Sequence, residues 1–228
     1  MLEGETTTLP PDQDPYIPTS YKDAMECKDS ERWMEAVKEE YSSILKNKTL
    51  TVMPVPFDRA TIKSRWIFSF KPVYKDVKPR YKARLVAKGC SQLYGVDYLD
   101  TYAPVVKHYS IRLVLAIEAA KDLDIMQLDI KTAFLYGDLK EEIYLEQPEG
   151  FVIPGKEKEV CRLHKGIYGL KQASRVWNLK FNNFLINFGL KRCISDPCVY
   201  YREQPDGEFT IVIIYVDDDY NNWDLGVP

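Results

Sequence analysis

Histidine and cysteine are both scarce in this chain of 228 residues. The two histidines, His108 and His164, are isolated from each other. The five cysteines are scattered, and only Cys193 and Cys198 lie close together, with no histidine at a zinc-ligand spacing. The pattern argues against a zinc site and against a disulfide framework, so we expect free thiols in a reducing compartment.

The sequence also lacks any apolar run of the ~18–20 residues that a membrane span requires. It starts with MLEGETTTLPPDQD, which has neither the basic nor the apolar region of a signal peptide. We therefore expect an intracellular, cytoplasmic protein with no membrane partner. Hydrophobic residues at 45% and charged residues at 29% are typical of a globular domain.

The chain has no overall excess of positive charge, since its net charge is −3. Residues 58–88 nevertheless carry ten Lys or Arg against two acids, whereas the first 57 residues carry eleven acids against six bases. Screening confines the field of a charge cluster to ~10 Å. A local basic stripe can therefore bind phosphates whatever the net charge of the chain.

Apolar periodicity divides the chain into a short leader and one domain. Residues 1–19 are rich in Thr, Pro and Asp and are predicted to be disordered. Helices are predicted over 30–47, 110–123 and 170–188, and strands over 50–55, 66–74, 80–88, 125–130, 142–145, 159–163, 198–202 and 209–216. The two kinds of element mix without regular alternation, so the predicted class is α+β.

The strand predicted over 80–88 has two chemically different faces. Alternation places Tyr81, Ala83, Leu85 and Ala87 on one face and Arg80, Lys82, Arg84 and Lys88 on the other. The first face suits a core and the second suits phosphate binding. The alternative is that the charged face is only solvated.

Two predicted strands end in carboxylates. TIVIIYVDD closes with Asp217 and Asp218, and IMQLDIKTAF carries Asp129 near the end of its apolar part. Adjacent carboxylates repel each other, and a divalent cation removes that penalty. If the strands are neighbours, the three carboxylates could hold two ions ~3.5–4 Å apart for phosphoryl transfer. The alternatives are a polar turn at 217–219 and a helix-capping role for Asp129.

IMQLDIKTAF, KGIYGLKQASRVW and IIYVDD, in this order, resemble the consecutive palm motifs of reverse transcriptases. RYKARLVAKG, GVDYLDTYAPVVK and EEIYLEQPEGF narrow the resemblance to copia-type LTR retrotransposon Pol polyproteins, and ERWMEAVKEEYSSILKNKTL and SRWIFSFK resemble the start of that family's domain. The resemblance covers residues 20–218. It implies a polymerase with fingers over about 20–108, palm and interleaved fingers over about 109–218, and an antiparallel palm sheet backed by helices.

The resemblance implies an RNA-directed DNA polymerase that adds a dNTP to a primer 3′-hydroxyl on an RNA or DNA template. Asp129, Asp217 and Asp218 would be the catalytic carboxylates and would bind two Mg²⁺ ions, with Mn²⁺ as an alternative ion. The carbonyl of Ile130 would be a further metal ligand. Tyr215 would lie near the primer terminus.

The resemblance also implies nucleotide contacts from six residues: Lys82, Arg84, Phe134, Tyr168, Gly169 and Lys171. Lys82 and Arg84 would bind the triphosphate, and which of them makes the contact stays open. Phe134 would exclude a ribose 2′-hydroxyl, with a core phenylalanine as the alternative. Gly169 would let the backbone approach the nucleotide and template base, because a side chain there would block the approach.

After Asp218 the sequence departs from the family pattern. Residues 219–228 form a divergent tail, DYNNWDLGVP, without an apolar return strand. We expect a domain truncated after the catalytic hairpin and missing the thumb, connection and ribonuclease H segments of a full polyprotein. We also expect the 228-residue chain to extend a primer no faster than its Asp217→Asn variant. The alternative function is a catalytically inactive retroelement remnant, at most a nucleic-acid-binding module.

Overall fold

The computed structural model describes residues 15–72, 79–203 and 209–215. Asp217, Asp218, the tail over 219–228 and most of the predicted leader therefore lie outside the described residues. The helices are α1 (Tyr21–Glu26), α2 (Ser30–Lys46), α3 (His108–Lys121) and α4 (Ala173–Asn187), with short 3₁₀ helices η2 (Gly89–Ser91) and η3 (Ala133–Tyr136). Among the described residues, none of the helices is both long and apolar enough to span a membrane.

The described strands form three sheets. They are β1 (Leu50–Pro54), β2 (Thr61–Ile62), β3 (Ser64–Lys71), β4 (Arg80–Ala87), β5 (Asp138–Glu146), β6 (Glu159–Lys165), β7 (Lys191–Arg192), β8 (Val199–Glu203) and β9 (Phe209–Ile213). One sheet has the order β1-β6-β5-β2, the second is the β3–β4 hairpin, and the third has the order β7-β8-β9. All pairs are antiparallel except β2–β5. The predicted α+β class is confirmed.

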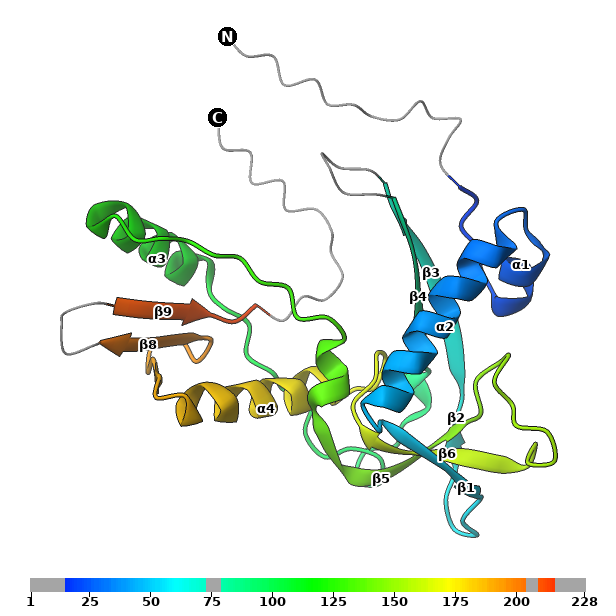
Figure 1. The fold of residues 1–228 in the computed structure, drawn as a ribbon. Helices are drawn as coiled ribbons and strands as arrows, with labels where there is room; N and C mark the ends of the chain where they lie inside the picture. The colour runs from blue at the N-terminus through cyan, green and yellow to red at the C-terminus, as the bar shows by residue number, and fades with distance from the viewer. Residues whose placement is uncertain (1–14, 73–78, 204–208, 216–228) are drawn as a thin grey trace.

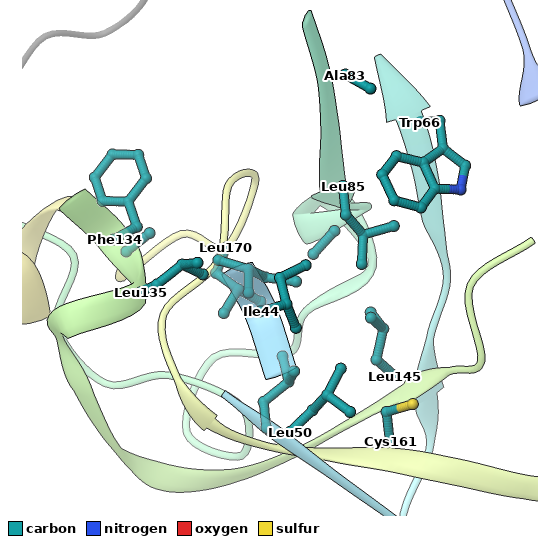
Figure 2. Packing of buried hydrophobic residues seen from close by; sticks show 14 of the residues in the cluster. Ile44, Leu50, Trp66, Ala83, Leu85, Phe134, Leu135, Leu145, Cys161 and Leu170 are labelled. Carbon is teal, nitrogen blue, oxygen red and sulfur yellow. The ribbon is translucent and has the colours of Figure 1, made fainter. Parts of the chain in front are cut away.

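Helix α2 forms where the sequence predicts it and covers the β3–β4 hairpin. Trp33, Val37 and Ile44 recur at helical spacing and are fully buried. The Trp33 ring meets Phe68 of β3 edge-on, with 5.4 Å between ring centroids. Figure 2 shows this core, in which side chains from α2, β1 and β3–β6 converge. The core fixes β4, and β4 carries the predicted basic face.

The second half of the described chain has a much smaller core. Leu185, Leu190, Tyr200 and Ile214 join α4 to the β7–β9 sheet. Figure 1 shows α3, β8 and β9 grouped at one end of the molecule, away from α2 and the β3–β4 hairpin. Ser110 is the one buried residue of α3, so this helix depends on a few specific contacts and little on an apolar face.

One predicted element is wrong. The segment 125–130 is irregular, and its Ile125, Met126 and Leu128 side chains are 62%, 79% and 77% exposed. An apolar segment becomes a strand only when a neighbour takes up its backbone hydrogen bonds. Within the described ranges no strand pairs with it, and β9 pairs only with β8. The expected placement of Asp129 at the end of a sheet strand is therefore not observed.

Candidate nucleotide and metal site

The basic face of β4 lies as its alternation predicts. Ala83, Leu85 and Ala87 are buried against the core, while Lys82 and Arg84 are half-buried on the opposite face. Pairing with β3 sets this register, since Arg84 lies opposite Ile67 and Leu85 lies opposite Trp66. Burial of Leu85 and Trp66 fixes the position of β4, and β4 in turn fixes the positions of Lys82 and Arg84.

The motif around Gly169 lies against the end of β4. The backbone N–H of Ala87 donates to the carbonyl of Tyr168 at 2.8 Å, and Val86 and Tyr168 form a parallel bridge. Gly169 has φ of +84°, and a Cβ there would clash with the carbonyl oxygen of Ala87. Glycine is therefore required for this contact between backbones, whether or not a nucleotide also approaches it.

Three of the predicted nucleotide residues meet through their side chains. The Arg84 guanidinium lies over the Tyr168 ring, 4.9 Å from its centroid. The Phe134 ring packs edge-on against the Tyr168 ring, with 4.8 Å between the ring centroids and an interplanar angle of 77°. Phe134 comes from η3 and is only 7% exposed. Its buried position is consistent with a core phenylalanine and also places the ring beside Tyr168.

Lys171 is exposed and is held by a tyrosine from a distant loop. Its Nζ donates to the Tyr98 hydroxyl at 3.1 Å and lies 4.6 Å from the centroid of that ring. A cation over an aromatic face is stabilised by the ring quadrupole. The position of this charge is therefore defined before any ligand arrives.

The predicted metal ligands are only partly described. Asp129 and Ile130 lie in the irregular, exposed segment before η3. Tyr215 follows β9 and is 47% exposed, whereas Asp217 and Asp218 lie outside the described residues. In the part of the chain that the structure describes, no three His, Cys, Asp or Glu side chains are grouped closely enough to hold one metal ion.

Glu40 is a further titratable residue of this region, and no motif in the sequence predicts its role. It is buried on α2, close enough to β4 to accept a hydrogen bond from the Leu85 backbone. Burial raises the pKa of the Glu40 carboxyl to about 6. A hydrogen bond from the Leu85 backbone and the charges of Arg84 and Lys82 act in the opposite direction and lower the pKa, but they do not outweigh burial. The sequence does indicate that Glu40 is buried, because it falls seven residues after Trp33 and three after Val37, within the apolar stripe of the helix.

Glu40→Gln is expected to stabilise the protein at pH 8. The folded carboxyl binds its proton more tightly than the unfolded one, so stability from this group is full below about pH 4.5 and is lost as pH rises through about 6. The loss amounts to about 2 kcal/mol in the free energy of unfolding. Urea unfolding at pH 4.5 and pH 8 would measure it. Glu39→Gln, which removes an exposed carboxylate 2.7 Å from Arg80, is the control with little effect. A less stable Glu40→Gln variant at pH 8 would contradict the prediction.

Comparison with known proteins identifies the family. A family profile described as reverse transcriptase (RNA-dependent DNA polymerase) matches residues 47–220. The chain belongs to this reverse transcriptase family. It is 44% identical over 201 residues to the retrovirus-related Pol polyprotein from transposon TNT 1-94 of Nicotiana tabacum, covering 88% of this chain and 15% of that protein.

Two further relatives come from Arabidopsis thaliana. The Pol polyproteins from transposons RE1 and RE2 are 38% and 40% identical over 196 residues, 86% of this chain and 13% of each relative. The predicted resemblance to copia-type Pol polyproteins is confirmed, and the chain spans about a seventh of the length of these relatives. No solved structure matches it.

Proposed function

We propose that this chain is the RNA-directed DNA polymerase part of a copia-type retrotransposon Pol polyprotein. It would transfer a nucleotide from a dNTP to a primer 3′-hydroxyl on an RNA or DNA template. Family membership supports the reaction class. The observation that carries the site is the meeting of Arg84, Tyr168 and Phe134, from three separate segments, at the end of β4. The division into fingers and palm stays a prediction.

The side chains of this site suit a dNTP. Lys82 and Arg84 would bind the triphosphate through charge-assisted hydrogen bonds, which are among the strongest available to a side chain. Lys171 and the exposed backbone of Gly169 would contact the nucleotide or the template base. Phe134, packed on Tyr168, would close the space beneath the sugar.

The donor set of the metal site fits Mg²⁺. Asp129, Asp217 and Asp218 offer carboxylate oxygens and Ile130 a carbonyl oxygen, which are the hard ligands that Mg²⁺ prefers, and Mn²⁺ accepts the same donors. Two bound ions would supply stabilisation of the attacking and leaving oxygens. The protein's own task is to bring the segment that carries Asp129 to the residues that follow β9.

A second candidate function is a nucleic-acid-binding module without catalysis. The observation that favours it is the exposed, irregular segment around Asp129, where a polymerase needs a fixed carboxylate. In such a module the basic face of β4 would still bind the phosphates of a nucleic acid, and the affinity for nucleic acid would fall as the salt concentration rises. The two functions differ in whether nucleotide is incorporated.

Primer extension would test the proposal. Residues 1–218 would be joined to the segment that follows the matching region in the tobacco relative, and compared with the 228-residue chain. We expect Mg²⁺-dependent incorporation of dTTP by the chimera on a poly(rA) template with an oligo(dT) primer. A folded chimera that binds this template-primer but incorporates no dTTP would overturn the polymerase proposal and leave the binding module.

Phe134→Ala is expected to raise the use of ribonucleotides by the chimera. A smaller side chain beneath the sugar admits the 2′-hydroxyl, and a steric difference of this size is worth at least about tenfold in selectivity. The ratio of UTP to dTTP incorporation measures it and does not depend on the folded fraction. Leu135→Ala, a neighbouring core truncation, is the matched control. An equal ratio in the two variants would assign Phe134 to the core alone.

A further inference from the structure

Two glutamine side chains are almost completely buried beside the Gly169 motif. Gln92 is 4% exposed and Gln172 is 1% exposed. An amide loses several hydrogen bonds to water when it is buried, so such a side chain is stable only when the protein replaces them. The hydrogen-bond partners of each buried glutamine therefore show which segments it holds together.

The amides form one directed chain of hydrogen bonds. The backbone N–H of Lys171 donates to Gln92 Oε1 at 2.8 Å, Gln92 Nε2 donates to Gln172 Oε1 at 3.0 Å, and Gln172 Nε2 donates to the carbonyl of Asp97 at 2.8 Å. A flip of the Gln92 amide would set an NH₂ group against the Lys171 N–H. The hydrogen bonds therefore form only with both amides in one orientation, and a pair of apolar side chains would not impose this restriction.

The same loop holds both ends of Lys171. Gln92 binds its backbone, and Tyr98, next to Asp97, binds its ammonium. The 3₁₀ helix η2, which directly precedes Gln92, packs against the same motif, since a Cβ on Gly89 would clash with the carbonyl oxygen of Gly169. The loop over 89–98 and the motif over 168–172 are thus one interlocked unit, and its exposed side presents Lys171 and Gly169.

We propose that Gln92 and Gln172 are positioning residues of the nucleotide site, which fix Lys171 and the Gly169 backbone for contact with the nucleotide and template. The inference rests on the proposed function, because it takes Lys171 and Gly169 as ligand contacts. Neither glutamine touches the ligand. Displacement of a contact group by ~1 Å can cost on the order of a hundredfold in rate. Loss of either buried amide would therefore weaken the site by letting Lys171 and the Gly169 backbone shift.

Gln172→Met and Gln92→Met in the 228-residue chain would test the inference, with two measurements. The first is the rate of acetylation of Lys171, relative to the exposed Lys140, with no ligand present. The second is the affinity for a poly(rA)–oligo(dT) template-primer with dTTP and Mg²⁺. We expect Lys171 to be acetylated several-fold faster in both variants and the affinity to fall about tenfold, as for the loss of one charge-assisted hydrogen bond.

Gln147→Met is the matched control. The Gln147 amide also joins backbone segments, donating to the carbonyls of Lys156 and Glu159 and accepting from Ile153 N–H, but in the connection between β5 and β6. We expect it to lower stability without changing Lys171 acetylation or affinity. Where the buried variants do not fold, Tyr98→Phe serves instead, because it removes only the hydroxyl that accepts from Lys171, and it should also raise the acetylation rate.

The outcomes separate the inference from the proposed function. A Gln172→Met variant that matches Gln147→Met in both acetylation and affinity would overturn the inference and leave the glutamines a structural role. A wild-type chain that binds neither dTTP nor template-primer would overturn the proposed binding function. In that case the nucleotide part of the inference fails with it, and the acetylation rates alone decide whether the glutamines hold Lys171.

Discussion

Asp129→Asn in the chimera is expected to reduce Mg²⁺-dependent nucleotide incorporation by more than about a hundredfold. Asparagine keeps the size of the side chain but removes the negative charge that makes a carboxylate a strong Mg²⁺ ligand. A misplacement of reacting groups by ~1 Å already costs about a hundredfold, so loss of a shared ligand should cost at least as much. Asp129 is exposed, so the substitution should leave the fold and its stability unchanged. The rate of dTTP incorporation at saturating Mg²⁺ measures the effect.

Asp124→Asn is the control for this experiment. Asp124 lies in the same irregular segment, is also exposed and has the same chemistry, but it has no counterpart in the metal-binding motif. We expect its incorporation rate to match that of the parent chimera. Equal activity of the Asp129→Asn variant and the parent would remove Asp129 from the metal site.

Asp196→Ala is expected to lower the free energy of unfolding by about 3 kcal/mol. Asp196 is 2% exposed, and its Oδ2 accepts from Ser110 Oγ at 2.6 Å and from the Lys107 backbone at 2.9 Å. Its Oδ1 accepts from Cys198 N–H at 3.0 Å. Burial acts to raise the pKa of Asp196, but these hydrogen bonds outweigh it and hold the pKa below the usual value. Truncation leaves several donors unpaired, at about 1–3 kcal/mol for each buried group.

The loss should be concentrated in α3. Asp196 ties the start of this helix to the chain before β8, and at the other end Lys121 lies 4.9 Å from the centroid of the Phe209 ring. We expect hydrogen-exchange protection of α3 to fall further than that of α2, beside a lower urea midpoint. Asp100→Ala, which breaks an exposed 3.1 Å ion pair with Arg175, should cost less than about 1 kcal/mol. A variant that loses no α3 protection would show that Asp196 does not anchor this helix.

Because Asp196 accepts as an anion, its contribution depends on pH in the direction opposite to that of Glu40. Its folded pKa is lowered, so the stability it provides is present above the ordinary aspartate range and is lost as pH falls through the folded pKa. The same truncation measured at acidic pH should therefore show a smaller difference from the parent.

The sequence alone determined the elements with a strong periodic signal. The apolar stripe of α2 and the alternation of β4 required only local geometry, because each face is set by a repeat of 3.6 or 2 residues. It also determined the family, since several motifs in a fixed order identify a homologous chain. The basic face with Lys82 and Arg84 follows directly from that alternation and lies where it was predicted.

Tertiary structure decided the features that depend on a partner distant in sequence. Nothing in the local pattern distinguishes Gln92, Gln172 or Asp196 from surface residues, because their burial arises from segments 75 to 89 residues away. The failed strand over 125–130 has the same origin. Its apolar composition permits a strand, but a strand also needs a neighbour to take up its backbone hydrogen bonds. Composition is local, whereas a hydrogen-bond partner is supplied by the fold.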